Sequence, residues 1–560
     1  MAEMAVYNAA SDLIDRNMRA GRGDKPAFID RTRRLTYAEL DRASARLANH
    51  LRRLGLRRED RIALVLLDTV DFPVIFLGAI GAGIVPVPLN TLLTADQYAY
   101  ILDDTRARIA FVSEPLLPTI EQACQKVPDI ELVVVGATKE TQHCTLAAYG
   151  QESDHFAMVA THPDEPAFWL YSSGSTGMPK GTKHIHTSLM ATAELFAQQT
   201  LGMREDDVVY SAAKLFFAYG LGNALTFPMS VGATAVLFDG RPTPDAVFDI
   251  MRREQPTIFC GAPTGYAAVL AEPKYTRESG SRRLRVCVSA GEALPEHLGL
   301  AWRERFGCDI VDGVGSTEML HIYLSNRPDD IRYGTSGRAV PGYELRLLDE
   351  SGREVADDEI GELFVHGPSA AEGYWNQRDK SRSTFGGAWT RTGDKFVRDR
   401  DGRYTYCGRA DDMFKVSGVW VSPFEVESAL ISHPAILEAA VIPHADADGR
   451  YTFSGRADDM FKVSGIWVSP FEVESALITH PSVLEAAVVP EADPEGLLKP
   501  KAFVVLRPDA KTDGLGEALK DYVKQKIGVW KYPRWIEVVD SLPKTATGKI
   551  LRYKLRDGTA

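Results

Sequence analysis

Residues 171–181 form a loop of small and hydroxyl-bearing residues, Tyr-Ser-Ser-Gly-Ser-Thr-Gly-Met-Pro-Lys-Gly, whose composition suits the binding of phosphate groups. Its glycines allow backbone N–H groups to approach an anion, its hydroxyls add hydrogen-bond donors and its lysine adds a positive charge. An apolar run precedes the loop and a helical pattern at 188–199 follows it, so we predict a strand, a loop and a helix. A flexible linker is the alternative interpretation. The candidate phosphate-binding residues are Ser172, Ser173, Gly174, Ser175, Thr176, Gly177 and Lys180.

The size and composition of the chain indicate a cytoplasmic enzyme with more than one domain. A chain of 560 residues is too long for one hydrophobic core. Its net charge of −12 argues against a nucleic-acid-binding protein, and its six cysteines have no metal-binding spacing. The first residues do not resemble a signal peptide, and the longest apolar stretch, 76–89, is too short and glycine-rich to cross a membrane. We therefore expect neither a nucleic-acid nor a membrane partner.

The order of predicted elements indicates a layered α/β architecture. Strand-like and helix-like segments alternate through residues 1–165 and again through 166–330. One of the helices spans 35–54 and begins at a capping box formed by Thr36 and Glu39. Short strands separated by Asp/Gly turns then predict a small antiparallel sheet or barrel over 336–407. Residues 408–560 mix strands and helices, as expected for a smaller C-terminal domain.

A segment of 47 residues occurs twice in tandem, at 401–447 and 448–494. The two copies differ at nine positions and are identical at 38. Solenoid repeats diverge more than this and need several copies to bury a core. A recent tandem duplication is the simpler explanation.

The motifs along the chain resemble, in type and order, those of the adenylate-forming superfamily of acyl-CoA synthetases, luciferases and peptide-synthetase adenylation domains. The resemblance covers nearly the whole chain. Segments 214–223 and 316–322 look more specifically like the benzoate-CoA ligase branch. Besides the loop at 171–181, the motifs are Ser289-Ala-Gly-Glu-Ala-Leu-Pro295, Gly313-Val-Gly-Ser-Thr-Glu318, Arg391-Thr-Gly-Asp394, Gly408-Arg-Ala-Asp-Asp412 and Pro543-Lys-Thr-Ala-Thr-Gly-Lys549.

The resemblance implies a reaction in two steps and a fold in two parts. A carboxylate would attack the α-phosphate of ATP to give acyl-AMP and pyrophosphate, and the thiol of coenzyme A would then displace AMP. ATP, Mg²⁺ and coenzyme A are the implied cofactors and co-substrates. The implied fold is α/β: a large N-terminal domain (1–408) of two layered α/β sheets plus a small β-barrel (336–407), and a smaller mobile α+β C-terminal domain (458–560). Residues 409–457 would hold the hinge and a surplus repeat copy.

Three residues are implied to act on the reacting groups. Thr317 would contact the α-phosphate, and Glu318 would be the Mg²⁺ ligand, as oxygen suits that hard ion. Lys549 would bridge the substrate carboxylate and the α-phosphate as charge moves between them. The other implied ATP-binding residues, for adenine, ribose and phosphates, are Gly291, Glu292, Asp312, Gly313, Asp394 and Arg409.

The implied acyl pocket combines small residues with flat or branched ones, which suits a planar ring better than a fatty chain. Its set contains no evident cationic partner for a second carboxylate, so we expect benzoate or a small ring-substituted benzoate. Two of its members, Tyr219 and His321, either hydrogen-bond a ring substituent or simply pack. The pocket candidates are Phe217, Ala218, Tyr219, Ala290, Gly315, His321 and Ile322.

The tandem segment duplicates the implied hinge, at Asp411 and Asp458, and the glycines of the implied coenzyme A tunnel, Gly418 and Gly465. We expect the second copy to build the C-terminal domain and the first to be surplus; the reverse is the alternative. The protein is then either a full ligase or, alternatively, an ATP- and aryl-acid-binding protein with impaired or adenylation-only activity. A monomer or a homodimer fits the sequence.

Overall fold

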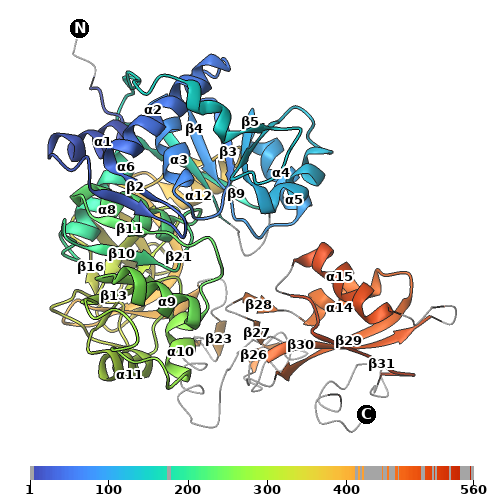
Figure 1. Cartoon of the computed structure of the whole chain (residues 1–560). Helices are drawn as coiled ribbons and strands as arrows, with labels where there is room; N and C mark the ends of the chain where they lie inside the picture. The colour runs from blue at the N-terminus through green and yellow to red at the C-terminus, as the bar shows by residue number, and fades with distance from the viewer. Residues whose placement is uncertain are drawn as a thin grey trace. The chain divides into compact units, whose positions relative to one another are not determined.

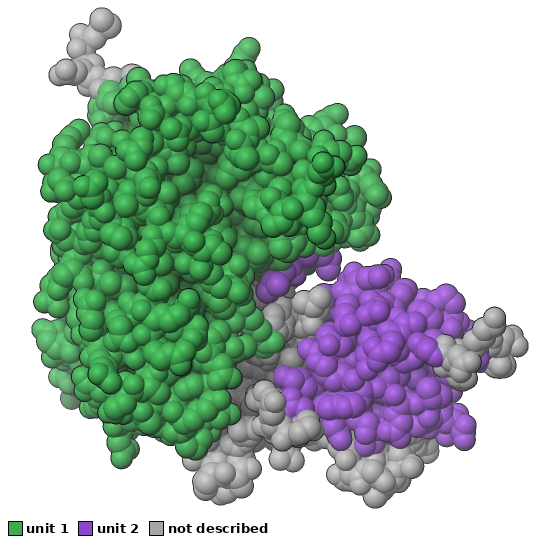
Figure 2. Space-filling view, in the orientation of Figure 1, with its two compact units in different colours: residues 1–91, 95–407 green, residues 92–94, 408–560 purple. Residues whose placement is uncertain are grey.

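The computed structural model describes residues 5–172 and 178–409 continuously, and shorter parts of the chain after them. The later described residues are 414–416, 419–421, 444–445, 451–452, 461–463, 466–468, 470–493, 498–507, 510, 514–528, 531–542 and 555. The chain divides into two compact units (Figure 2). Unit 1 contains residues 1–91 and 95–407, and unit 2 contains residues 92–94 and 408–560.

The first sheet of unit 1 has five parallel strands in the order β4-β3-β5-β6-β7. Its inner strands are continuous buried runs of apolar residues, as expected for a parallel sheet covered on both faces. The strands are β3 (Arg61–Val65), β4 (Val85–Pro88), β5 (Ile109–Ser113), β6 (Glu131–Val135) and β7 (Cys144–Thr145). The helical segments of this region are α1 (Ala9–Arg19), α2 (Tyr37–Arg53), α3 (Asp71–Gly81), α4 (Ala95–Thr105), η1 (Glu114–Leu116), α5 (Leu117–Cys124) and η2 (Leu146–Gln151).

Helix α2 confirms the predicted capping box. The Thr36 hydroxyl accepts a hydrogen bond from the Glu39 backbone N–H, and the Glu39 carboxylate accepts one from the Thr36 N–H at 2.8 Å. The helix buries Leu40, Leu47 and Leu51 in the main core of unit 1. It contacts α3, which is buried along nearly its whole length.

The second sheet has nine strands in the order β16-β15-β14-β13-β12-β10-β11-β1-β2. The run from β14 to β1 is parallel, whereas β15, β16 and β2 are antiparallel edges. The strands are β1 (Pro26–Ile29), β2 (Arg34–Thr36), β10 (Val208–Ser211), β11 (Thr234–Val236), β12 (Ile258–Gly261), β13 (Val286–Ser289), β14 (Ile310–Gly315), β15 (Ile322–Ser325) and β16 (Arg338–Ala339).

Helices and strands of the nine-stranded sheet together form a second core around Trp302, Tyr266 and Phe248. Figure 1 shows α9, α10 and α11 grouped near β13. Two π-helical segments, η3 and η4, lie elsewhere along this sheet. The helical segments are α6 (His186–Thr192), η3 (Ala193–Gln198), α7 (Ala218–Leu221), η4 (Gly222–Thr226), α8 (Phe227–Val231), α9 (Pro244–Glu254), α10 (Pro263–Ala271) and α11 (Glu296–Phe306).

A small three-stranded sheet corrects the predicted surroundings of the phosphate loop. The loop joins two antiparallel strands, β8 (Pro166–Ser172) and β9 (Lys180–Ile185), and a third strand, β19 (Gly373–Tyr374), pairs with β9. The helix predicted at 188–199 is confirmed, because α6 begins at His186 and η3 continues to Gln198, but the strand β9, which was not predicted, lies between the loop and α6. The physical reason is pairing on both edges: β9 satisfies its backbone groups with β8 and with a strand nearly two hundred residues later.

The predicted β region of unit 1 is a five-stranded antiparallel sheet, in which β17-β18-β21-β20 are neighbours and β22 also pairs with β21. This sheet contributes Leu347, Leu363 and Phe396 to the main core. The elements are β17 (Glu344–Leu348), β18 (Ile360–His366), α12 (Arg378–Thr384), β20 (Phe385–Gly386), β21 (Trp389–Arg398) and β22 (Tyr404–Arg409).

Unit 2 has its own core, formed where α14 and α15 cover a three-stranded sheet. Strand β29 is antiparallel to β30, and β30 is parallel to β31. The elements are α14 (Pro470–Ile478), β29 (Val483–Ala492), β30 (Leu498–Leu506), α15 (Leu515–Ile527) and β31 (Trp535–Val538).

Both repeat copies form the same two-stranded hairpin. In the first, β23 (Phe414–Val416) pairs with β24 (Val419–Val421), and in the second, β27 (Phe461–Val463) pairs with β28 (Ile466–Val468) in the equivalent register. Strand β27 contacts β30 of the core sheet of unit 2. Strand β23 contacts β26, a short strand in the second copy that pairs with β25; these two strands are β25 (His444–Ala445) and β26 (Tyr451–Thr452).

No helix within the described part of the chain has both the length and the apolar character needed to cross a membrane.

Candidate functional site

The described ends of the phosphate loop face each other across the β8–β9 hairpin. Ser172 closes β8 and is paired with Lys180, which opens β9. Gly181 follows Lys180, and a Cβ added there would lie 3.0 Å from the ring of Tyr171, so this close approach favours glycine. The remaining loop candidates lie outside the described residues: Ser173, Gly174, Ser175, Thr176 and Gly177.

Lys180 and Glu318 meet at the base of this loop, although they are far apart in sequence. The Lys180 ammonium lies 3.6 Å from Glu318 Oε1, and their side chains are 11% and 17% exposed. Tyr374 lies between them: its hydroxyl donates to Glu318 Oε1 at 2.7 Å and accepts from Lys180 Nζ at 3.2 Å. The structure thus brings a carboxylate close to the cation of the candidate phosphate-binding hairpin, an arrangement that suits a metal–polyphosphate.

The backbone around Thr317 and Glu318 is held from two sides. The His184 Nε2–H of β9 donates to the Thr317 carbonyl at 2.8 Å, and the Ala371 N–H donates to the Glu318 carbonyl at 2.8 Å. Burial lowers the pKa of His184 to about 4, so the imidazole is neutral at pH 7 and retains one N–H. Leu320 has a φ of +66°, a left-handed conformation that a leucine rarely adopts. The surrounding contacts therefore hold the loop in an unusual backbone conformation. Such conformations are found more often at functional sites than elsewhere.

Tyr219 lies at the carboxyl ends of two parallel strands. Its hydroxyl donates to the Val288 carbonyl of β13 at 2.9 Å and also lies 3.2 Å from the Gly261 carbonyl of β12. Ala290 directly follows β13 and is buried. In open α/β sheets, ligands bind outside the carboxyl ends of the strands. The structure therefore places Tyr219 and Ala290 at the carboxyl ends of the parallel strands, where a ligand is expected.

His321 packs among aromatic rings in this structure. Its ring centroid lies 4.4 Å from that of Phe227 and 5.3 Å from that of Phe196, and its Nε2 is 3.3 Å from the Tyr219 carbonyl. Burial lowers the pKa of His321 to about 3, so the imidazole is neutral. Of the two predicted roles, packing is the one that these contacts show.

Close packing explains the glycines around His321. A Cβ at Gly222, in the π-helical η4, would lie 2.4 Å from His321 Cδ2, and a Cβ at Gly315 would lie 2.6 Å from the His321 carbonyl oxygen. Phe196 belongs to the other π-helical segment, η3. Such segments occur frequently at functional sites, and here both contact the same histidine.

The other pocket candidates differ in exposure. Ala218 begins α7 and is half-buried, and Ile322 begins β15 and is fully buried. Phe217 precedes α7 and is 49% exposed, so it does not line an enclosed slot in this conformation.

The candidates for adenine and ribose lie on different elements. Gly291 and Glu292 follow β13, and Gly313 follows Asp312 within β14. Asp312 is buried, and this burial raises the pKa of its carboxyl to about 8. Asp394 lies half-buried in β21, in the antiparallel sheet of unit 1, whereas Arg409 ends β22 and belongs to unit 2.

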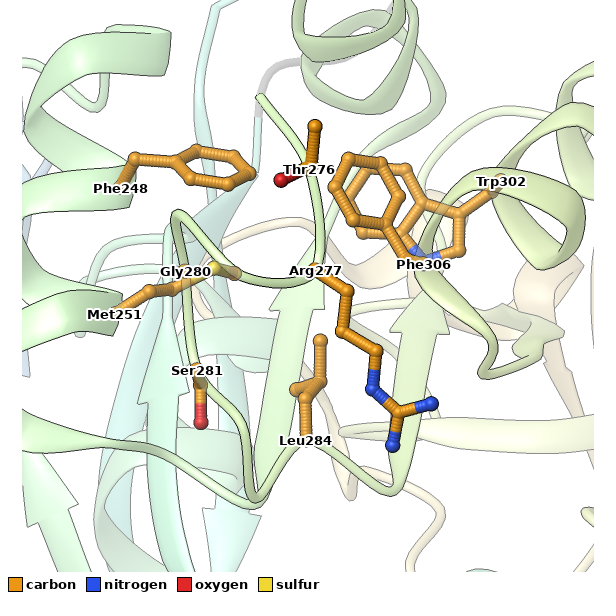
Figure 3. Close-up of a pocket in the computed structure, with 9 residues that line it drawn as sticks. All are labelled: Phe248, Met251, Thr276, Arg277, Gly280, Ser281, Leu284, Trp302 and Phe306. Carbon is orange, nitrogen blue, oxygen red and sulfur yellow. The ribbon is translucent and has the colours of Figure 1, made fainter. Parts of the chain in front are cut away.

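A small cavity elsewhere in unit 1 is unrelated to these candidates. Figure 3 shows Phe248 of α9 and Trp302 of α11 on opposite sides of it. Its volume of about 10 Å³ is close to that needed for one water molecule and is far below that of an aromatic acid. It is therefore not the substrate site.

Two residues that contact the candidate site were not predicted from the sequence, His184 and Tyr374. His184 lies two residues after Thr182 within Lys180-Gly-Thr-Lys-His-Ile185, so a strand assignment there would have placed both on one face. Tyr374 has no such signal, because its place depends on strand pairing across the chain. The predicted residues that lie outside the described residues are Lys549, Asp411, Asp458, Gly418 and Gly465.

Glu318 fits the role of a Mg²⁺ ligand by its donor chemistry and its partial exposure. The described residues contain no group of three or more His, Cys, Asp or Glu side chains that could hold a metal by themselves. Mg²⁺ commonly takes one or two carboxylates and completes its shell with substrate phosphates and water. A single carboxylate beside the candidate phosphate-binding hairpin fits this pattern.

The sequence of this chain matches a known protein family. Residues 14–375 match the family of AMP-binding enzymes, and residues 472–549 match the AMP-binding enzyme C-terminal domain. The chain is 53% identical to a 4-hydroxybenzoate-CoA/benzoate-CoA ligase of Rhodopseudomonas palustris, over 99% of this chain and 94% of the relative. It is 52% identical to a benzoate-CoA ligase of Thauera aromatica, over 98% of this chain and 96% of the relative.

Solved structures agree with the sequence relatives. A benzoate-CoA ligase from Burkholderia xenovorans superposes with a TM-score of 0.70 and 45% identity, covering 98% of this chain and all of that one. An anthranilate-CoA ligase, AuaEII, solved with anthranoyl-AMP, superposes with a TM-score of 0.71 and 39% identity, covering 99% of this chain and 97% of that one. With matches that together span both units, the chain belongs to the family of AMP-binding enzymes.

Proposed function

We propose that this chain is an ATP-dependent aryl-CoA ligase that activates benzoate, or a small ring-substituted benzoate, as benzoyl-AMP and then transfers the acyl group to coenzyme A. Two relatives that are more than half identical over nearly the full length of this chain carry the corresponding names. The observation that carries the proposal within the structure is the meeting of Lys180 and Glu318 at the phosphate-binding hairpin.

The first step needs charge neutralisation, because a carboxylate is a weak nucleophile that must approach a polyanion. Lys180 supplies a cation for the outer phosphates, and Thr317 lies beside Glu318 to contact the α-phosphate. Mg²⁺, when bound at Glu318, spreads the negative charge of the triphosphate. Lys549 is proposed to bridge the substrate carboxylate and the α-phosphate, and Asp394 is proposed to accept hydrogen bonds from the ribose hydroxyls.

The acyl slot is proposed at the edge formed by Tyr219, Ala290 and Gly315. Tyr219 already donates its hydroxyl hydrogen to the sheet, and His321 directs its Nε2 toward the Tyr219 carbonyl. Neither group therefore offers a spare proton to the substrate through these atoms. This favours an unsubstituted or weakly substituted ring over one that must accept a hydrogen bond.

A substrate panel tests this proposal. Rates of pyrophosphate release should be compared for benzoate, hydroxy-, amino- and halobenzoates and a medium-chain fatty acid. We expect benzoate or a small substituted benzoate to have the highest kcat/KM. A clear preference for the fatty acid would reject the aryl slot.

The duplicated segment bears on the second step. We propose that the second copy supplies the C-terminal domain, with Asp458 as hinge and Gly465 in the coenzyme A tunnel. Two observations support this: β27 contacts the core sheet of unit 2, and the C-terminal family match begins at residue 472, within the second copy. Because the first copy would be surplus, one alternative stays open: an enzyme that forms acyl-AMP but transfers the acyl group poorly to coenzyme A.

A further inference from the structure

We propose that Tyr374 is a positioning residue that sets the orientation of the Glu318 carboxylate for Mg²⁺ and thereby the metal requirement of the enzyme. The inference rests on the proposed function, since it assumes that Glu318 binds the metal of Mg-ATP.

The Tyr374 hydroxyl forms a hydrogen bond with only one of the two carboxylate oxygens of Glu318. It donates to Oε1 at 2.7 Å, and the Lys180 ammonium lies 3.6 Å from the same oxygen. No hydrogen bond to Oε2 occurs among the described residues. Because a carboxylate rotates about its terminal torsion unless it is held, this bond selects the rotamer in which Oε2 remains open to a metal.

The tyrosine also holds Lys180. Lys180 Nζ donates to the Tyr374 hydroxyl at 3.2 Å and lies 4.3 Å from the centre of the Tyr374 ring. The hydroxyl therefore links the phosphate-loop lysine to the metal carboxylate and keeps their charges compensated. When a triphosphate draws Lys180 away, the bond from Tyr374 still fixes Glu318.

Tyr374 can act in this way because its own position is fixed. Its backbone pairs with Thr182 in β9, and the Trp375 N–H donates to the Gly181 carbonyl at 2.7 Å. The Tyr374 N–H donates to Ser381 Oγ at 2.9 Å, and the whole residue is only 6% exposed. The segment that carries Tyr374 thus spans from the phosphate hairpin to the Glu318 loop.

The substitution Tyr374→Phe removes only the hydroxyl and keeps the ring beside Lys180. We expect the Mg²⁺ concentration for half-maximal binding of α,β-methylene-ATP, measured by calorimetry, to rise about tenfold, as for loss of a hydrogen bond to a charged group. The KM for benzoate should stay within about twofold. Tyr275→Phe is the matched control, because Tyr275 also donates to a carboxylate, that of Asp245, but packs in the second core.

A double-mutant cycle separates positioning from general structure. On the background of Glu318→Gln, Tyr374→Phe should change the Mg²⁺ requirement by less than about twofold, because Tyr374 would act through the carboxylate. An unchanged Mg²⁺ requirement in Tyr374→Phe, or additive effects in the cycle, would overturn the inference while leaving the proposed function intact. Failure of the unmodified enzyme to bind the nucleotide with Mg²⁺ would instead refute the proposed function, and this inference with it.

Discussion

Removal of the Tyr219 hydroxyl should weaken benzoate binding, and its cost in stability should equal that of removing the Tyr266 hydroxyl. Tyr219 and Tyr266 both donate to the same carbonyl, that of Val288, at 2.9 and 2.8 Å. Tyr219 belongs to the proposed acyl slot, whereas Tyr266 is buried in the second core against Trp302. In either Tyr→Phe variant the other tyrosine still satisfies Val288. The two substitutions therefore form a matched pair that differs mainly in the location of the ring.

The magnitude follows from one lost neutral hydrogen bond, worth about 1 kcal/mol. We expect Tyr219→Phe and Tyr266→Phe each to lower the free energy of unfolding by about that amount. Only Tyr219→Phe removes the hydrogen bonds that join α7 to the ends of β12 and β13. Only this variant should therefore also weaken the binding of benzoate, by a similar free energy. A change of about 1 kcal/mol corresponds to a rise of about fivefold in the KM for benzoate.

The assay is the initial rate of pyrophosphate release with benzoate and ATP varied in turn, together with thermal unfolding of both variants. Tyr219→Phe should raise the KM for benzoate and leave that for ATP unchanged. If both variants lose equal stability and neither changes the KM for benzoate, Tyr219 supports the sheet edge and does not shape the acyl slot.

Three further predictions concern pH, the adenylation lysine and the repeat. Burial gives His184 a pKa of about 4 in the folded protein, against about 6.5 in the unfolded chain. The unfolded state therefore binds a proton more readily, and the free energy of unfolding falls as the pH drops from 6.5 toward 4. At pH 5 this loss amounts to about 2 kcal/mol. His184→Gln should flatten the fall of the melting temperature between pH 7 and pH 5, and an unchanged slope would show that another group governs acid lability. Lys549→Ala should abolish ATP–pyrophosphate exchange and largely spare thioester formation from supplied benzoyl-AMP; normal exchange would exclude the proposed role. Deleting 401–447 should preserve or increase coenzyme A-dependent turnover, because the second copy then follows residue 400 directly; a loss of turnover would show that the first copy is not surplus.

The parallel sheets were predictable because burial on both faces forces continuous apolar runs. Strands such as β3, β5 and β13 are short runs of this kind, and they belong to the predicted alternation of strands and helices. The capping box at Thr36 was equally readable, because its two hydrogen bonds join residues three apart.

Long-range pairing explains what the sequence could not supply. The strand β9 was not predicted, because its partners are β8 and β19 and only one of them is local. The position of Tyr374 depends on the same pairing. His321 lies close to Tyr219, another pocket candidate, but its aromatic surroundings come from η3 and α8, whose approach no local pattern specifies.

The most direct test of the proposed function is to quantify pyrophosphate, benzoyl-AMP and benzoyl-CoA in parallel from one reaction with ATP, Mg²⁺ and benzoate, with and without coenzyme A. We predict benzoate-dependent pyrophosphate release in both reactions, and benzoyl-CoA with an equal amount of AMP only when coenzyme A is present. Pyrophosphate release that does not depend on any aryl acid, or its absence, would contradict the proposed function.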